Sequence, residues 1–416
     1  MLTRRNTKPL QIGNMQIGGN SAVSIQSMTK TPTSDIDATL KQINSLYENG
    51  CEIIRCAVPD MDSAIALKDI VNESPIPVVA DIHFHHELAI KSIASGVHAL
   101  RLNPGNIRDH TKVKDIVSKA KSAAIPIRIG VNFGSLPPVG SIGKTKGISR
   151  HNKGVEDLPR YNKNSNVYSQ VDHMVRTALW EIDILESLQF YDIKISMKAF
   201  DIETTVEAYK SISKLIPYPI HLGITESGTK DSGSIRSAIG IGMLLYEGIG
   251  DTIRVSLSDD PVEEVLAANN ILKSLNLKNT GITLVSCPGC ARADVDIINL
   301  AKKVDSITKK SKSKLKIAVM GCEVNGPGEA KDADLGIAAG VGKAIIFKKG
   351  KKDKVVKEIP NKTVTKAKGR DVDIKKDVAP KEPIKQQSPS SDKEKQETQK
   401  TAKDWGRASN DPRNKN

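Results

Sequence analysis

Eight short apolar runs, each followed by a longer stretch with helical spacing, recur through the first 260 residues and constrain the fold more than any other feature. Runs of β-branched and apolar residues predict buried strands, whereas apolar residues three and four positions apart predict amphipathic helices. The eight predicted strands are 21–28, 51–58, 77–84, 98–104, 125–132, 192–199, 219–226 and 251–258.

The stretches between these runs predict the helices that connect parallel strands. Residues 37–50 and 86–98 are amphipathic, and each has a glycine near its end, where glycine favours a helix C-cap. Eight strands alternating with helices favour a closed (β/α)8 barrel, or TIM barrel, over an open doubly wound sheet. The one irregular interval is 134–170, which is polar and rich in Gly, Pro and Asn, and we expect it to pass over the barrel mouth.

A second, smaller α/β unit is expected after a closing helix at 261–275. Its apolar runs are 281–290, 315–322, 335–340 and 343–350, and the last two are joined by Val-Gly as in a hairpin. From residue 351 onward the chain is rich in Lys, Gln, Ser and Pro and nearly empty of large apolar residues, so burial cannot offset the entropy of ordering it. We therefore predict a barrel domain at 1–276, a small domain at 277–350 and a disordered Lys-rich tail at 351–416.

The net charge of +14 is concentrated near the C-terminus. From Lys351 to Asn416 there are 19 Lys and Arg against 11 Asp and Glu. Aromatic residues make up only 3% of the chain and leave few rings for base stacking, which argues against a nucleic-acid partner. No apolar run of 18 residues and no signal peptide are evident, so we expect a cytoplasmic protein with no membrane partner.

Polar residues cluster at the ends of the predicted strands, where TIM barrels build their active sites. Five strands each contribute one cation, and a group of like charges is costly to bury unless a polyanion compensates it. We therefore expect a phosphorylated small-molecule substrate, although any single arginine could instead pair with a carboxylate or lie outside the barrel. The strand-end residues are Arg55, Asp81, His83, Arg101, Asn103, Arg128, Asn132, Lys198, Thr225, Glu226, Arg254 and Ser256.

Three of these strand-end residues are candidates for proton transfer. Asp81, His83 and Glu226 carry side chains that titrate, although each could also be a structural hydrogen-bonding residue. Glu226 lies among apolar neighbours in the sequence ITESG, so its pKa is the one that we expect burial to raise.

The five cysteines lie in two regions and do not resemble a disulfide framework. Cys287 and Cys290 follow one predicted strand of the small domain, and Cys322 follows the next, so their thiols are expected to meet at one edge. Three convergent thiolates indicate zinc or an iron-sulfur cluster. A redox-active CxxC pair or three buried thiols are the alternatives, while Cys51 and Cys56 are expected to be core residues.

The lack of a fourth cysteine near this group bears on the kind of metal site. No histidine occurs after His221, which disfavours a closed zinc site. An iron with a weak or exchangeable fourth ligand can bind substrate, and Glu329 is the candidate for that ligand.

The motifs of the chain resemble those of the 4-hydroxy-3-methylbut-2-enyl diphosphate synthase family of the non-mevalonate isoprenoid pathway. The resemblance runs from about residue 8 to residue 350. It is carried by VSIQSMTKT, EIIRCAVPD, VADIHFH, RLNPGNI, RIGVNFGSL, SMKAFD, LGITESG, SCPGC and above all MGCEVNGPGEA. The departures are MKAFD and SCPGCAR, which differ from the more usual KASD and CPSCGR segments, together with 134–170 and the tail.

The resemblance implies a TIM barrel and a sulfite-reductase-like domain with a 4Fe-4S cluster held by Cys287, Cys290, Cys322 and Glu329. The implied enzyme opens the ring of 2-C-methyl-D-erythritol 2,4-cyclodiphosphate with two electrons from flavodoxin or ferredoxin. Members of the family are homodimers. Glu226, with Asp81 and His83, would handle protons. The diphosphate would bind to Arg55, Arg101, Asn103, Arg128, Asn132, Lys198, Arg254 and Ser256.

Two other functions remain open from the residues alone. One is a zinc or cluster protein whose basic tail binds an acidic partner or RNA. The other is a barrel lyase that acts on sugar phosphates without redox chemistry and would not need Cys322.

Overall fold

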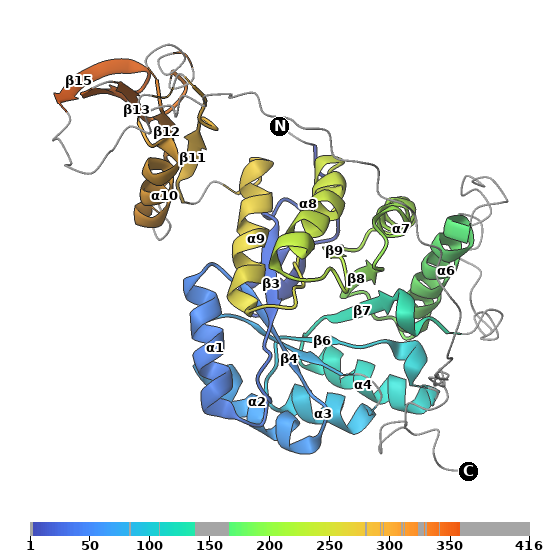
Figure 1. Cartoon of the computed structure of the whole chain (residues 1–416). Coiled ribbons are helices and arrows are strands. Elements are labelled where there is room, and N and C mark those ends of the chain that lie inside the picture. Colours follow the sequence, from blue (N-terminus) through green and yellow to red (C-terminus); the bar gives the residue numbers. More distant parts are fainter. Residues whose placement is uncertain are drawn as a thin grey trace, which may run out of the picture. The chain divides into compact units, whose positions relative to one another are not determined.

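The computed structural model describes residues 3–82, 85–107, 109–137, 166–278, 281–291, 293, 295–308, 311, 313–322, 328, 331–340 and 342–357. Within them, eight parallel strands form the barrel, in the hydrogen-bonded order β8-β7-β6-β5-β4-β3-β10-β9 (Figure 1). A single parallel bridge between Ile195 and Ile220 links β8 to the segment that leads into β9. The predicted (β/α)8 barrel is thereby confirmed as a nearly closed ring.

All eight predicted barrel strands are present, though each is shorter than its apolar run. Both β9 and β10 contain only two residues with ladder pairing. The strands are β3 (Ser24–Met28), β4 (Ile53–Ala57), β5 (Val78–Asp81), β6 (Ala99–Arg101), β7 (Ile127–Asn132), β8 (Ile193–Lys198), β9 (His221–Leu222) and β10 (Thr252–Ile253).

A helix follows each barrel strand and packs outside it (Figure 1). Aspartates cap several of these helices: Asp35, Asp60 and Asp201 each accept a hydrogen bond from the backbone N–H three residues on, which fixes where the helix begins. The helices are α1 (Ile36–Glu48), α2 (Met61–Glu73), α3 (His86–Ala94), α4 (His110–Ser122), α6 (Asn166–Ser187), α7 (Ile202–Leu215), α8 (Lys230–Tyr246) and α9 (Pro261–Ser274). In the described part of the chain, no helix is both long enough and apolar enough to cross a membrane.

Strand β8 illustrates how alternation separates the core from the site. Ile193, Ile195 and Met197 are fully buried in the main hydrophobic cluster between strands and helices. The alternate residues, among them Ser196 and Lys198, point into the barrel and line its cavity. The inside of the barrel is therefore lined by polar side chains near its C-terminal mouth, whereas the layer between the strands and the helices is apolar.

An N-terminal hairpin, which the sequence analysis did not predict, covers the base of the barrel. Strands β1 (Leu10–Ile12) and β2 (Met15–Ile17) pair in antiparallel register. Their apolar side chains pack with Ile53, Val79 and Ala99, which lie at the N-terminal ends of β4, β5 and β6. With the base closed by this cluster, the C-terminal mouth is the end at which a ligand can enter.

The excursion predicted at 134–170 is described only at its two ends. Residues Phe133–Ser135 form a short 3-10 helix, and 138–165 lie outside the described residues. At the other end the prediction is wrong, because Asn166 already begins helix α6. The first turn of this helix continues a polar stretch of sequence, so its composition did not indicate a helix.

The small unit is a five-stranded sheet in the order β11-β12-β13-β14-β15. Strands β11 to β13 are parallel, and β14 and β15 follow as an antiparallel meander, so the hairpin predicted between the third and fourth apolar runs is confirmed. Helix α10 (Ile297–Thr308) contacts β11 and β12. The strands are β11 (Thr283–Ser286), β12 (Lys316–Met320), β13 (Leu335–Gly340), β14 (Lys343–Lys348) and β15 (Lys351–Lys357).

Strand β15 corrects the prediction that disorder begins at residue 351. Lys351–Lys357 pairs with β14 although every one of its side chains is exposed. Lys349 and Gly350 both have positive φ (47° and 72°), as a two-residue type I′ hairpin turn requires. Backbone hydrogen bonds to β14 order this segment without side-chain burial. A prediction made from composition considers only side-chain burial and therefore does not find such a strand. The predicted tail from residue 358 onward lies outside the described residues.

Candidate functional site

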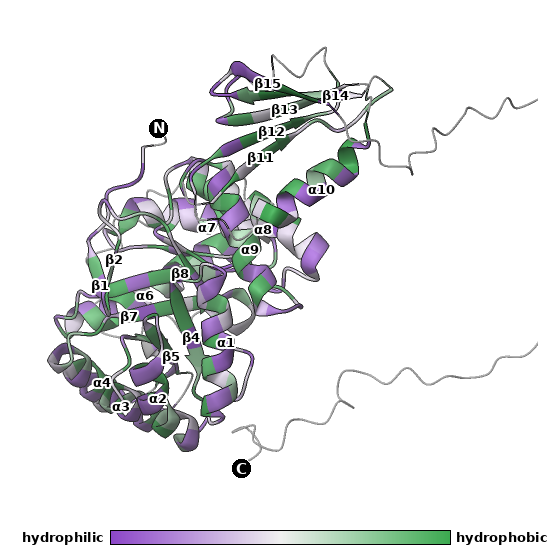
Figure 2. Cartoon of the chain, turned by 90° about the vertical axis from the view of Figure 1, so that its left-hand side faces the viewer, coloured by the Kyte–Doolittle hydropathy of each residue, from purple (hydrophilic) through white to green (hydrophobic). Residues whose placement is uncertain are grey.

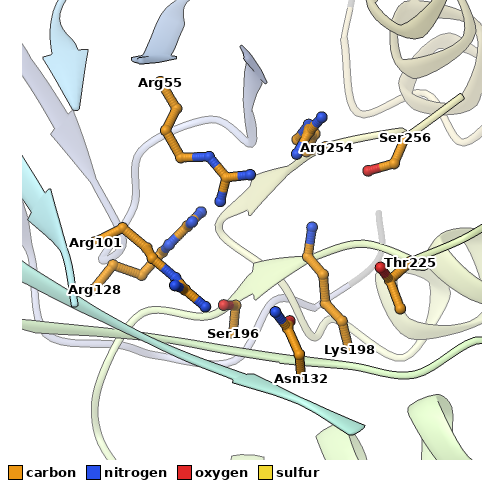
Figure 3. A pocket seen from close by; sticks show the side chains of 9 residues that line it. All are labelled: Arg55, Arg101, Arg128, Asn132, Ser196, Lys198, Thr225, Arg254 and Ser256. Carbon is orange, nitrogen blue, oxygen red and sulfur yellow. The ribbon is translucent and has the colours of Figure 1, made fainter. Parts of the chain in front are cut away.

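A cavity of about 70 Å³ opens among the C-terminal ends of the barrel strands (Figure 3). The five predicted cations all line it, together with three of the predicted polar residues, Asn132, Thr225 and Ser256. Figure 3 shows Arg55 and Lys198 directing their nitrogen atoms into a common space. The lining residues are Arg55, Arg101, Arg128, Asn132, Ser196, Lys198, Thr225, Arg254 and Ser256.

The cations of this cavity are deeply buried. Arg101, Arg128 and Lys198 are only 4%, 2% and 6% exposed. Burial, reinforced by the neighbouring arginines, holds the pKa of Arg128 and that of Lys198 well below their usual values. Burial lowers the pKa of Arg254 to about 10, and Arg55 is the next cause. The lowered pKa values mean that the charged forms of these side chains are disfavoured in the pocket, so its positive charge costs free energy. A bound polyanion would relieve that cost.

Two carboxylates offset part of this charge. Asp81 lies 3.7 Å from Arg55 Nε and 3.5 Å from an Arg101 guanidinium nitrogen, and its side chain is buried. Glu264, at the start of α9, lies 3.6 Å from Arg254 Nε and accepts the backbone N–H of Leu257 at 3.0 Å. Glu264 was not among the predicted site residues. Its position four residues after the N-cap Asp260, on the buried face of α9, is the signal that identifies it.

Two glycines make room for the cationic side chains. A Cβ atom on Gly130 would come within 2.6 Å of Arg101 Nε. A Cβ atom on Gly223 would come within 2.7 Å of both Lys198 Nζ and the carbonyl oxygen of Arg254. Because the Arg254 carbonyl belongs to the backbone of the neighbouring strand, Gly223 has less tolerance for a side chain than Gly130.

We expect Gly223→Ala to raise the KM for the substrate at least about tenfold and to destabilise the barrel by about 1–3 kcal/mol, because the new methyl displaces Lys198 and separates two strands. Gly242→Ala is the matched control, since a Cβ on Gly242 in helix α8 meets nothing within 4 Å. Steady-state kinetics and thermal unfolding of both variants measure the difference. Equal KM values and equal thermal stability in the two variants would show that the atoms around Gly223 can move aside for a methyl group at little cost.

The predicted polar ligands divide into two groups. Asn132 and Ser256 line the cavity, whereas Asn103 does not. The Asn103 amide donates to the Gly130 carbonyl at 2.8 Å, and its Oδ1 accepts the Gly130 N–H at 2.8 Å. The structure therefore favours a role for Asn103 in holding β7 in place. Ser196 was missed, although it lies two residues before Lys198 on the same face of β8.

The predicted acid–base residues occupy three different situations. Asp81 does not line the cavity but lies between two of its arginines, which favours a positioning role. Glu226 follows the cavity residue Thr225 and is exposed, so the enclosed apolar surroundings that we expected for it are absent. Its φ of 55° is in the left-handed region, which is uncommon for a glutamate. His83 lies outside the described residues.

Glu181 on helix α6 is a buried carboxyl that the sequence analysis missed. It is 2% exposed and accepts the backbone N–H of Gly105 at 2.7 Å, beneath the loop that follows Asn103. Burial raises the pKa of Glu181 to about 8, against the opposing effects of that hydrogen bond and of Arg101. Its place on the apolar face of α6, between Ala178 and Leu185, is the sequence signal.

We expect Glu181→Gln to reduce the fall in stability with rising pH. The folded pKa of Glu181 is above the unfolded value of 4.5, so its contribution to stability is complete below pH 4.5 and is lost as the pH rises to about 8. The glutamine keeps an acceptor for Gly105 and has no charge to bury. The unfolding free energies of the wild-type protein and of Glu181→Gln should agree near pH 4.5 and differ by a few kcal/mol above pH 8. Parallel pH curves would contradict the prediction, and exposed Glu203→Gln in helix α7 is the control.

Three of the four candidate metal ligands, the cysteines, lie at one end of the small sheet. Cys287 directly follows β11, and Cys322 lies two residues after β12, with Ser286 opposite Val319 in the parallel register. The Gly321 N–H donates to Cys287 Sγ at 3.3 Å, which places that sulfur beside the segment carrying Cys322. In the turn between Cys287 and Cys290, Gly289 has a φ of 77°, as the sequence Pro-Gly favours in a type II turn.

The chemistry of these thiols bears on which metal group they suit. Among the described residues, no three His, Cys, Asp or Glu side chains are close enough to hold a single metal ion. Cysteine thiolates bind both zinc and iron-sulfur clusters, and the N–H···S bond to Cys287 Sγ is of the kind that surrounds cluster sulfurs. The described cysteines are therefore compatible with a cluster. Glu329 lies outside the described residues.

Cys51 and Cys56 are core residues, as predicted. They are 1% and 0% exposed, and burial raises their pKa values to about 12 and about 11. Such thiols keep their protons and do not supply metal ligands at neutral pH.

Comparison with known proteins supports both the barrel domain and the small domain. Residues 7–269 match the GcpE TIM-barrel domain, and residues 283–372 match the GcpE protein C-terminal domain. A relative from Dehalococcoides mccartyi is 53% identical over 358 residues, which cover 86% of this chain and 96% of the relative. A relative from Clostridium perfringens is 50% identical over 357 residues, covering 86% of this chain and 96% of that protein. Both are named 4-hydroxy-3-methylbut-2-en-1-yl diphosphate synthase (flavodoxin).

Among solved structures, dihydropteroate synthase from Yersinia pestis matches 65% of this chain and 99% of its own, with a TM-score of 0.44 and 11% identity. The two matched domains, and identity of 50% or more to these two relatives across most of the chain, show the relationship. The chain belongs to the GcpE family, the family of the 4-hydroxy-3-methylbut-2-en-1-yl diphosphate synthases.

Proposed function

We propose that this protein reductively opens 2-C-methyl-D-erythritol 2,4-cyclodiphosphate to 4-hydroxy-3-methylbut-2-enyl diphosphate in the non-mevalonate isoprenoid pathway. The reaction consumes two electrons and two protons, breaks one carbon–oxygen bond to the ring phosphate and releases the departing hydroxyl as water. The names of relatives at 45–53% identity support this activity.

The cavity carries the proposal within the structure. Five cations line it, and among the described residues only Asp81 and Glu264 form ion pairs with them. That excess of positive charge suits a substrate with two phosphoryl groups, since Arg forks match phosphate oxygens in a bidentate manner.

The proposed division of labour follows the two units. The barrel, 1–276, binds the diphosphate through Arg55, Arg101, Arg128, Lys198 and Arg254, with Asn132, Thr225, Ser256 and the newly recognised Ser196 beside them. Asp81 and Asn103 keep Arg55, Arg101 and strand β7 in position. Glu226, next to Thr225, holds or delivers a proton at the rim of the cavity, and His83 is proposed to assist it.

The small domain, proposed at 277–350 and now extended to 357 by β15, would hold a 4Fe-4S cluster through Cys287, Cys290, Cys322 and Glu329. When bound, the cluster would supply electrons to the substrate one at a time. Around it, the Gly321 N–H orients Cys287 Sγ, and the turn at Gly289 brings Cys290 back toward the same end of the sheet.

The remaining parts of the proposal concern partners and location. Flavodoxin is the donor named for the relatives, and ferredoxin is the alternative. We propose a cytoplasmic homodimer, in keeping with the family and with thiols that need a reducing compartment.

Anaerobic turnover of the cyclic diphosphate tests this function. We expect a brown protein that forms the linear diphosphate with reduced flavodoxin, and a ferredoxin arm compares the two donors. A colourless zinc-containing protein, obtained when oxygen is excluded throughout, would overturn the proposal. So would ring opening without any reductant.

A further inference from the structure

The last two strands of the small sheet carry a concentration of lysine. Residues 343–357 contain seven lysines against one aspartate, and every residue of β15 is exposed. Figure 2 shows hydrophilic segments along this hairpin beside more hydrophobic ones. The opposite edge strand, β11, has the sequence TLVS and no lysine. The sheet therefore has one strongly basic edge.

This basic edge reaches the end of the sheet that carries the cysteines. Met320 of β12 lies opposite Ala338, Gly340 opposite Lys343, and Lys343 opposite Lys357. Because β15 runs parallel to β12, its final residues lie at the same end of the sheet as Cys322. Three strand spacings separate β15 from β12, which corresponds to roughly 14 Å.

Apolar surface lies among the lysines at this end. Val355 and Val356 are 47% and 42% exposed, between Lys354 and Lys357. Successive side chains of a strand alternate between its two faces, so each face of this strand end carries one exposed valine and one lysine. Exposed apolar side chains beside charged ones are typical of small, transient interfaces of electron-transfer proteins.

Edge protection is the competing explanation, since lysines on edge strands prevent sheets from pairing with one another. Any charge serves that purpose, and glutamate would do so as well as lysine. Reversing the sign of the charge therefore separates protection of the edge from recognition of an acidic partner.

We propose that the C-terminal end of β15, centred on Lys354–Lys357, is the docking surface for the flavodoxin-type electron donor and recognises an acidic face of that donor. The inference rests on the proposed function and adds the place at which the donor binds. At each of two encounters the donor is oxidised by one electron and the protein is reduced by one, which supplies the two electrons of the reaction.

The test compares Lys354→Glu/Lys357→Glu with the wild-type holoenzyme. We expect kcat/KM for reduced flavodoxin to fall about tenfold or more at low ionic strength, and the difference to shrink in about 0.5 M salt, where charges are screened. Turnover driven by a small reduced viologen dye, which needs no docking surface, should stay within about twofold of wild type. Lys354→Gln/Lys357→Gln should lie between the two and serves as the milder variant if charge reversal impairs folding.

Lys114→Glu/Lys119→Glu in helix α4 is the matched control, because it changes the net charge equally at exposed positions. Equal losses in both double variants, or an unchanged flavodoxin rate in the β15 variant, would overturn the docking surface. Parallel loss of dye-driven turnover would overturn it as well, by showing damage to the redox site. The dissociation constant for flavodoxin, measured without substrate, tests docking even if the wild-type enzyme does not open the cyclic diphosphate. Failure of the proposed function is thus distinguishable from failure of the surface.

Discussion

Replacing Cys322 with serine is expected to lower turnover by at least about a thousandfold and to remove most of the bound iron. A serine hydroxyl is a weaker ligand for iron than a thiolate and keeps its proton at neutral pH. The Gly321 N–H bond places Cys287 Sγ beside the segment that carries Cys322, so we expect the loss of one thiol to disturb a shared site. Iron analysis, the visible absorbance of the protein and anaerobic turnover together measure the effect.

Cys51→Ser is the matched control for that experiment. Cys51 is buried under the barrel helices and donates to the Ile53 carbonyl at 3.2 Å, a hydrogen bond that a serine hydroxyl can replace. We expect this variant to keep its iron and its turnover. Retention of a tenth or more of the turnover in Cys322→Ser would favour a barrel lyase without redox chemistry, because only a redox mechanism requires the cluster.

The barrel could be predicted from the sequence because its signals are local. Each apolar run coincides with a strand and each amphipathic stretch with a helix, and aspartate caps mark where α1, α2 and α7 begin. The five cavity cations were found because each lies in or directly after an apolar run, and alternation along a strand is a strict rule. Not all of them are at strand ends as predicted, since Arg128 is the second residue of β7. Ser196 could have been found by the same rule, two residues before Lys198.

The features that escaped prediction depend on contacts between distant segments. Asn103 looks like a ligand in sequence, but its amide pairs with the Gly130 backbone of the neighbouring strand. Glu264 and Glu181 come from helices whose faces turn toward the barrel only when the fold is complete. Strand β15 is ordered by backbone pairing with β14, and no side-chain pattern records that pairing.

Arg128→Met is expected to raise the KM for the cyclic diphosphate about a hundredfold, equivalent to about 3 kcal/mol, and at the same time to stabilise the ligand-free protein. Arg128 is 2% exposed, and its guanidinium donates to Gln26 Oε1 at 3.3 Å. Its Nε lacks a hydrogen-bond partner among the described residues. A guanidinium keeps its proton in proteins, so the depressed pKa of Arg128 signifies a charge held at a cost. Methionine fills similar space without that charge.

The opposite signs of these two effects distinguish a substrate ligand from a structural residue. Removing a structural residue weakens folding and binding together, whereas removing a buried charge held for a diphosphate weakens binding and strengthens folding, here by about 1–3 kcal/mol. Arg176→Met is the control, because Arg176 is exposed on α6 and, among the described residues, forms an ion pair only with Asp172, four residues away. Thermal unfolding without substrate, KM and iron content measure the three consequences separately. A destabilised Arg128→Met protein that also loses iron would assign Arg128 to the framework of the barrel. A more stable protein that keeps its iron but needs far more substrate would mean that the barrel retains this charge for the phosphates.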